Sequence, residues 1–168
     1  MFNKNLYFIL ILLNFINFYS SYSYAFESDS KEPIFLESDS AKWDEESQVS
    51  TYRGNVVVTQ GSMLLTGELL IVISKNDKIN KMVITGDKAT YKQNTSSGKI
   101  VNGEAKKIEH YVDQSKVIFI NKAVLTQSTN IVRSNKIIYK TDTENILAGN
   151  KDGKSRVKMI LEPKKDDE

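Results

Sequence analysis

Beyond residue 26 the chain alternates between short apolar runs and polar clusters, and this pattern predicts an all-β protein. The runs are rich in Val, Ile, Thr and Tyr, and helical periodicity is hard to find. Polar clusters expected to form turns lie at residues 75–78, 94–98, 113–115, 142–144 and 150–153. Both prolines, Pro33 and Pro163, lie near the chain ends, so no predicted strand interior loses a backbone donor.

The apolar runs repeat. Residues 52–73 align without a gap on residues 119–140, an offset of 67 residues. Residues 86–93 match residues 54–60 when one extra residue is allowed, so the repeating unit is about half the offset. A unit of this size cannot bury its own apolar face and becomes stable by stacking on its neighbours. The sequence therefore predicts stacked antiparallel β-strand repeats.

The alternation within each repeat predicts which side chains face inward, because successive residues of a strand point to opposite faces. The inward set in one strand of the unit is Val56, Val58, Ala89, Tyr91, Ala123 and Leu125. In the other strand it is Leu70, Val72, Ile108, His110, Ile137 and Tyr139. We therefore expect an apolar line through successive units.

One strand departs from the alternation. Leu69, Ile71 and Ile73 occupy the face that the alternation assigns to solvent, so this strand is apolar on both faces. We expect another part of the molecule to cover it, since large exposed apolar patches are uncommon on soluble proteins. The alternative is an exposed contact surface.

The first 25 residues form a segment of another kind. Lys4 is their only charge, and residues 6–19 are an apolar run interrupted by two asparagines. Small residues at Ser23 and Ala25 indicate cleavage after Ala25 and hence a signal peptide. A run of about 14 residues is short for a membrane-spanning helix, which needs about 20. The remainder is then expected to be one domain, residues 26–163, with a charged tail at 164–168.

Charge and residue types exclude several functions. The 23 basic and 21 acidic residues nearly cancel, which argues against a nucleic-acid partner. The chain has no cysteine, and its single histidine, His110, aligns with Val72 and Tyr139, positions of the inward line. The eight glycines form no phosphate-binding loop, and no metal-ligating side chains converge in the pattern. We predict a protein that is not an enzyme and has no metal or cofactor.

Residues 33–161 resemble the LptA (OstA-like) family of periplasmic lipopolysaccharide transport proteins. The similarity is carried by PIFLESDSAKWD, YRGNVVVTQGSMLLTGELLIV, GDKATYKQ, NGEAKKIEHYV and NKAVLTQSTNIVRSNKIIY. The resemblance implies an incomplete β-jelly roll with an open seam that admits the acyl chains of lipid A. It also implies end-to-end association, a membrane-anchored LptC-like partner at one end and an outer-membrane LptD-like partner at the other. An ATP-driven partner in the inner membrane would supply the energy.

Motif by motif, the resemblance assigns five groove residues and the inward parity adds six. The resemblance implies Ile34, Leu36, Tyr91, His110 and Val112, and the parity adds Val56, Val58, Leu70, Val72, Leu125 and Tyr139. Relatives commonly carry tyrosine where this chain has His110. Open sheet edges recruit strands from other chains, so we expect joints at Pro33 and Ile34 and at Val157, Met159 and Leu161.

The sequence therefore favours a periplasmic, lipopolysaccharide-binding bridge protein that shields lipid A between the inner and outer membranes and supports outer-membrane assembly. A membrane-anchored LptC-like protein is the alternative within the same pathway, and it would retain residues 1–25. A structural or adhesive β-solenoid with a packed interior and a secreted carbohydrate-acting enzyme are the alternatives from other classes.

Overall fold

The computed structural model describes residues 29–149 and 156–161, and the predicted signal peptide and charged tail lie outside them. The elements in chain order are η1 (Asp29–Lys31), β1 (Ile34–Glu37), β2 (Ser40–Asp44), β3 (Val49–Gln60), β4 (Met63–Lys75), β5 (Lys78–Asn94), β6 (Ile100–Tyr111), η2 (Val112–Gln114), β7 (Lys116–Gln127), β8 (Asn130–Lys140), β9 (Asn145–Ala148) and β10 (Lys158–Ile160). None of the helices in these ranges is long and apolar enough to cross a membrane.

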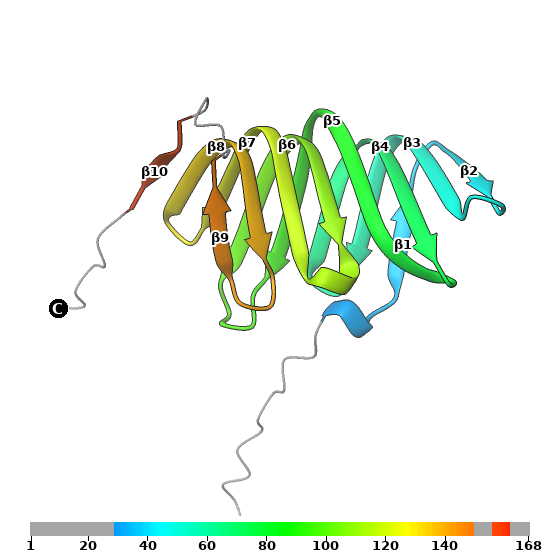
Figure 1. Cartoon of the computed structure of the whole chain (residues 1–168), viewed down its shortest axis with the longest axis horizontal. Coiled ribbons are helices and arrows are strands. Elements are labelled where there is room, and N and C mark those ends of the chain that lie inside the picture. The colour runs from blue at the N-terminus through cyan, green and yellow to red at the C-terminus, as the bar shows by residue number, and fades with distance from the viewer. Residues whose placement is uncertain (1–28, 150–155, 162–168) are drawn as a thin grey trace, which may run out of the picture.

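All described strands belong to one antiparallel sheet whose strands follow each other in chain order (Figure 1). The order is β1-β3-β4-β5-β6-β7-β8-β10, with β2 also paired to β3 and β9 also paired to β8. Each long strand therefore pairs with its neighbours in sequence, as hairpin-connected repeats require. The prediction of an all-β protein built from stacked antiparallel repeats is confirmed.

The long strands bend near their middles, where the pairing register shifts at each of the five interfaces from β3·β4 to β7·β8. The bend of β3 has positive φ at Gly54 (78°) and Asn55 (44°). The bend of β7, 67 residues later, has positive φ at Asn121 (64°) and Lys122 (54°). Gly and Asn tolerate such angles best, and extra residues of this kind bend a strand sharply. The sequence repeat is thus also a repeat of the bend.

These bends fold the sheet back on itself into two facing layers. Layer A contains β2, β9 and residues 49–53, 69–75, 78–85, 107–111, 116–120 and 136–140. Layer B contains β1, β10 and residues 56–60, 63–66, 89–94, 100–104, 123–127 and 130–134. Tyr91 of layer B meets Phe119 of layer A edge to face, with ring centroids 5.7 Å apart.

The core lies between the layers, and the predicted inward parity is confirmed by burial. Every residue of the inward set except His110 has at most 4% of its surface exposed, and His110 has 9%. Leu69, Ile71 and Ile73 point outward as expected and are partly buried. The expected cover is therefore incomplete, and Ile71 lies beside its Cα partners Thr51 and Val83 on the outer surface.

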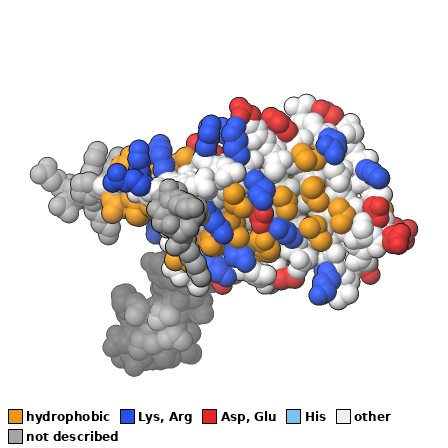
Figure 2. Space-filling view, turned by 45° about the horizontal axis from the view of Figure 1, so that its top comes forward, with side chains coloured by type: hydrophobic (Ala, Val, Ile, Leu, Met, Phe, Trp, Pro, Cys, Tyr) orange, Lys and Arg blue, Asp and Glu red, His pale blue; other side chains and the backbone are white. Residues whose placement is uncertain are grey.

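Lysine and arginine side chains break up the apolar residues of the outer surface (Figure 2). On layer A, Glu109 forms ion pairs with Lys81 (3.0 Å) and Lys107 (2.9 Å) and accepts a hydrogen bond from Tyr111. Long cationic side chains of this kind cover apolar neighbours with their stems while the charge stays in water.

Gly103 is required for the close approach of the two layers. A Cβ atom at Gly103 would lie 2.2 Å from Cε1 of Phe119, in the opposite layer. We expect Gly103→Ala to lower the free energy of unfolding by about 1–3 kcal/mol, because overpacking displaces Phe119 and separates the layers locally. Urea denaturation measures the change.

Gly86→Ala is the matched control, since its added Cβ would meet no heavy atom closer than 3.5 Å. Equal stability losses in the two variants would show that the space at Gly103 is not what the packing needs.

Candidate functional site

The two layers are continuous on one side of the molecule, through the bends, and end in turns on the other side. The turns at 61–62, 95–99 and 128–129 form the rim of layer B, and those at 45–48, 76–77, 112–115 and 141–144 form the rim of layer A. Among the described residues, the backbone hydrogen bonds of these turns stay within one rim. We call the line between the two rims the seam.

The inner surface of layer B is an apolar row that runs from one end of the sheet to the other. Cα pairing places Leu36, Val58, Leu65, Tyr91, Gly103, Leu125, Val132 and Met159 side by side across eight strands. Leu36 in β1 and Met159 in β10 are therefore the two ends of one wall.

Layer A contributes two parallel rows to the same interior. One contains Leu70, Ile84, Ile108, Phe119, Ile137 and Ala148, and the other contains Val72, Met82, His110, Val117, Tyr139 and Ile146. The rows of both layers face one another across the core. The result is an apolar interior bounded by the bends on one side and the seam on the other.

All eleven predicted groove residues lie on this interior, although not equally deep. The eight that are buried are Val56, Val58, Leu70, Val72, Tyr91, His110, Leu125 and Tyr139. Ile34 and Leu36 in β1 and Val112 in η2 are partly buried and pack against the core. The structure thus brings together residues from both layers that lie up to about a hundred positions apart in the chain.

Sequence reasoning missed several members of these three rows. Leu65, Met82, Ile84, Val117, Phe119 and Val132 are buried in the same rows. The offset of 67 aligns Leu65 with Val132, and Phe119 lies two residues before the bend of its strand as Tyr52 does in the earlier copy. Applying the parity rule to every strand, rather than to the best-aligned ones, would have found them.

The three inward rows are uncharged although they include three titratable side chains. Burial raises the pKa of Tyr91 well above its ordinary value and raises that of Tyr139 to about 12. Burial lowers the pKa of His110 to about 4, and its Nδ1 has no hydrogen-bond partner among the described residues. All three side chains are therefore neutral near pH 7, which suits an interior for apolar groups.

A cavity of about 260 Å³ lies at the mouth of the seam, between the two rims. Its lining includes Gln93 from layer B, His110 and Tyr139 from layer A, and Asp29 from η1. The Asp29 carboxylate accepts hydrogen bonds from the backbone N–H of Ser62 (2.8 Å), the Ser62 hydroxyl (2.7 Å) and Nε2 of Gln93 (2.7 Å). These bonds fix η1 to the rim of layer B.

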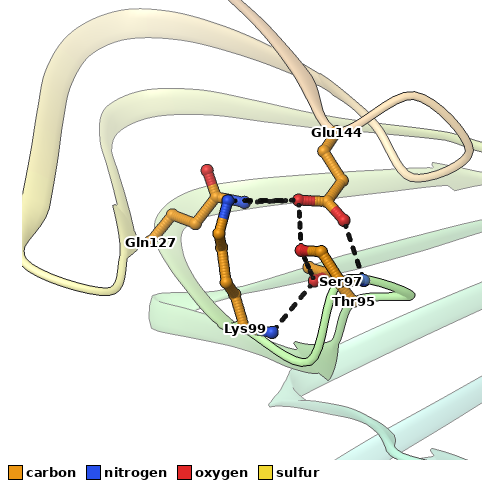
Figure 3. A network of polar contacts seen from close by, with 5 residues as sticks. All are labelled: Thr95, Ser97, Lys99, Gln127 and Glu144. Carbon is orange, nitrogen blue, oxygen red and sulfur yellow. Dashed lines mark hydrogen bonds and ion pairs between the residues drawn. The ribbon is translucent and has the colours of Figure 1, made fainter.

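A second carboxylate connects the two rims. Glu144, in the layer A turn between β8 and β9, accepts hydrogen bonds from the backbone N–H (3.2 Å) and hydroxyl (3.0 Å) of Ser97 and from Nε2 of Gln127 (3.0 Å) (Figure 3). Lys99 lies 4.0 Å from the same carboxylate. Burial acts to raise the pKa of Glu144, but the hydrogen bonds from Ser97 and Thr95 outweigh it and lower the pKa. The turns of the described residues contain no group of side chains that could hold a metal ion.

His110 should make stability depend on pH. In the unfolded chain the imidazole has a pKa near 6.5, and in the folded protein about 4. The neutral form is therefore favoured by folding, so stability is full above pH 6.5 and falls as the pH drops towards 4. Between pH 7 and pH 4.5 the free energy of unfolding should therefore fall. We expect this fall to be smaller in His110→Phe than in the wild-type protein, by on the order of 2 kcal/mol. Urea unfolding at both pH values tests this, and an unchanged difference between them would contradict it.

Comparisons with known proteins identify the family. The family model for "LptA/(LptD N-terminal domain) LPS transport protein" matches residues 36–145. The lipopolysaccharide export system protein LptH of Pseudomonas aeruginosa is 34% identical over 154 residues, covering 87% of this chain and 88% of that protein. The corresponding LptA proteins of Haemophilus influenzae and Escherichia coli K12 are each 31% identical and cover 86% and 84% of this chain, and 85% and 77% of their own lengths.

The fold agrees with that of a solved relative. The crystal structure of LptH, the LptA-homologous periplasmic component of the lipopolysaccharide transport device of Pseudomonas aeruginosa, superposes with a TM-score of 0.76 at 31% identity. The match covers 81% of this chain and 99% of that one. The chain therefore belongs to the LptA/(LptD N-terminal domain) family of lipopolysaccharide transport proteins.

Proposed function

We propose that this protein carries lipopolysaccharide between the inner and outer membranes with the acyl chains of lipid A held between layers A and B. The observation that carries the proposal is the apolar wall, which runs without a charged side chain from Leu36 in β1 to Met159 in β10. The sugar part of the lipid would extend through the seam, where most side chains of both rims are polar.

The free energy of hydrocarbon transfer explains why such a wall is needed. Each methylene group removed from water contributes about 0.8 kcal/mol, so an acyl chain of about 12 carbons gains roughly 10 kcal/mol from a dry interior. A wall of similar side chains along its whole length would bind the chains comparably at each position. One much deeper site would instead hold the lipid for a long residence time.

The two ends of the sheet are the proposed joints. Among the described strands, β1 and β2 at one end each pair only with β3, and β9 and β10 at the other end each pair only with β8. Their free edges offer backbone donors and acceptors to another strand. End-to-end copies of this chain, an LptC-like protein and an LptD-like protein are the proposed partners, contacting Pro33 and Ile34 at one end and Val157, Met159 and Leu161 at the other.

The proposed location is the periplasm, reached through cleavage of a signal peptide after Ala25. The relatives support this location, since LptH is a periplasmic component of its transport device. A membrane-anchored LptC-like protein differs in retaining its first 25 residues. We propose no enzymatic role and no cofactor, in keeping with relatives that are export proteins.

The tight packing between the layers also fits a rival function. Val58, Leu65 and Ile108 have no exposed surface, as in a structural β-solenoid that binds no lipid. The two functions differ in whether lipopolysaccharide ever contacts the inward side chains, and this can be measured directly.

A photo-crosslinking amino acid at Leu36 or Tyr91 should capture lipopolysaccharide during transport, because both side chains lie on the wall. Leu36 is only partly buried, so the larger side chain fits there without disturbing the core. Lys92 is the control, since it follows Tyr91 but points to solvent. Immunoblotting for lipopolysaccharide adducts gives the readout. Capture at Lys92 alone, or at none of the three positions, would refute a lipid path between the layers.

Met159→Asp should weaken self-association about tenfold or more, because it places a charge at the free end of the wall. Met159 is 59% exposed in β10, so the substitution should leave the fold of the single chain intact. Sedimentation velocity over a range of concentrations measures the effect. Asn76→Asp, in an exposed turn between β4 and β5 and away from both ends of the sheet, is the control, and equal behaviour of the two variants would exclude a C-terminal joint at Met159.

A further inference from the structure

Where the two layers are in contact, their inward side chains have almost no exposed surface. The inward residues Val58, Leu65, Tyr91 and Phe119 are at most 1% exposed, and the edge-to-face contact of Tyr91 with Phe119 spans the gap between the layers. Protein interiors are close-packed, so a bound chain must replace contacts rather than fill an empty space. The layers must therefore separate before lipid lies between them.

Separation is easiest at the seam, since the opposite side is closed by continuous backbone through the bends. The two rims are joined at the seam by side chains, and the Glu144 network is the prominent link (Figure 3). Its donors lie on two different layer B elements, the turn that contains Ser97 and the end of β7 at Gln127. One carboxylate thus holds two parts of the opposite rim.

The opposite rim is itself organised to receive this carboxylate. Thr95 is 4% exposed and its hydroxyl accepts a hydrogen bond from the backbone N–H of Lys99 (3.1 Å). The same hydroxyl lies 2.9 Å from the Ser97 hydroxyl, which donates to Glu144. The turn is closed by further backbone bonds between Thr95 and Lys99 and between Gly98 and Thr95. The donors to Glu144 are therefore held in place.

The backbone at Glu144 has the conformation found at the end of other layer A turns. Its φ is 54°, in the left-handed region that favours glycine or asparagine over glutamate. Gln48 (52°) and Ser115 (45°) have the same conformation at the last position of their turns, so it belongs to the turn rather than to the glutamate. Here the glutamate side chain reaches the other rim, which glycine or asparagine cannot do.

We propose that Glu144 is a clasp that holds the seam shut near the β9 end of the molecule, and that lipopolysaccharide enters or leaves the space between the layers only when this clasp opens. Glu144 acts on the lipid through the position of the rims, so it is a positioning residue rather than part of the wall. The inference rests on the proposed transport function, because a protein that binds no lipid would have no use for an opening seam.

A reversible disulfide across the seam tests the clasp, and the absence of native cysteine makes the pair unambiguous. Ser97→Cys with Glu144→Cys would draw the rims closer together when oxidised, because two cysteines span less than the native serine and glutamate, and would release them when reduced. We expect oxidation to slow the loading of purified lipopolysaccharide by about tenfold or more, and dithiothreitol to restore it. The matched control is Asn80→Cys with Asp113→Cys, a pair whose native side chains are hydrogen-bonded (2.8 Å) within layer A. Its oxidation should leave loading unchanged.

The outcomes separate the clasp from the transport function. Equal loading of the oxidised and reduced Ser97–Glu144 pair would overturn the clasp and leave lipid binding intact. If neither the reduced pair nor the wild-type protein binds lipopolysaccharide, the proposed transport function fails and the clasp fails with it.

A second measurement does not depend on a disulfide. Spin labels at Ser96 and Asp142, exposed residues on opposite rims, report the width of the seam by pulsed electron paramagnetic resonance. Glu144→Asn keeps the backbone conformation but is too short to reach Ser97, so it should broaden and lengthen the distance distribution without lipid. Glu46→Gln, in another layer A turn, should not. A distribution that responds to neither Glu144→Asn nor bound lipopolysaccharide would rule out a clasp at this position.

Discussion

The bend in the middle of every long strand is the feature on which the rest of the structure depends. Without these bends, which in β3 and β7 have positive φ angles at Gly54, Asn55, Asn121 and Lys122, the strands would form one flat sheet with an exposed apolar face. With them, each strand contributes to both layers and covers its own neighbours. Because the fold closes by bending and not by pairing edges, the described residues on the other side of the molecule are joined across the seam by side chains.

This asymmetry relates stability to transport. The interior must be dry and uncharged to receive hydrocarbon, which burial achieves by keeping His110, Tyr91 and Tyr139 neutral. The same burial packs the interior closely, as at Gly103 and Phe119. A bound acyl chain would have to replace these contacts, and the proposed access of lipid depends on how firmly the rims are joined.

The two carboxylates at the seam differ in what they join. Asp29 binds Ser62 and Gln93, so it fastens η1 to a single rim, whereas Glu144 bridges both. At the ends of the sheet the exposed groups are of another kind, because β1 and β10 present backbone donors and acceptors there. The proposed lipid access at the seam and the proposed chain-to-chain contact at the ends therefore use separate surfaces and separate kinds of bond.

The sequence by itself determined the strands, their repeat and the inward side chains, because the alternation of side chains along a strand is a local property of the backbone. Val56, Tyr91 and Leu125 could be assigned to the interior without any knowledge of what they face. The role of Glu144 could not, since in the sequence it is an acidic residue in a polar turn, where a solvated charge is expected. Its partners Ser97 and Gln127 come within reach only when the bends bring layer A over layer B, and only the tertiary structure decided that meeting.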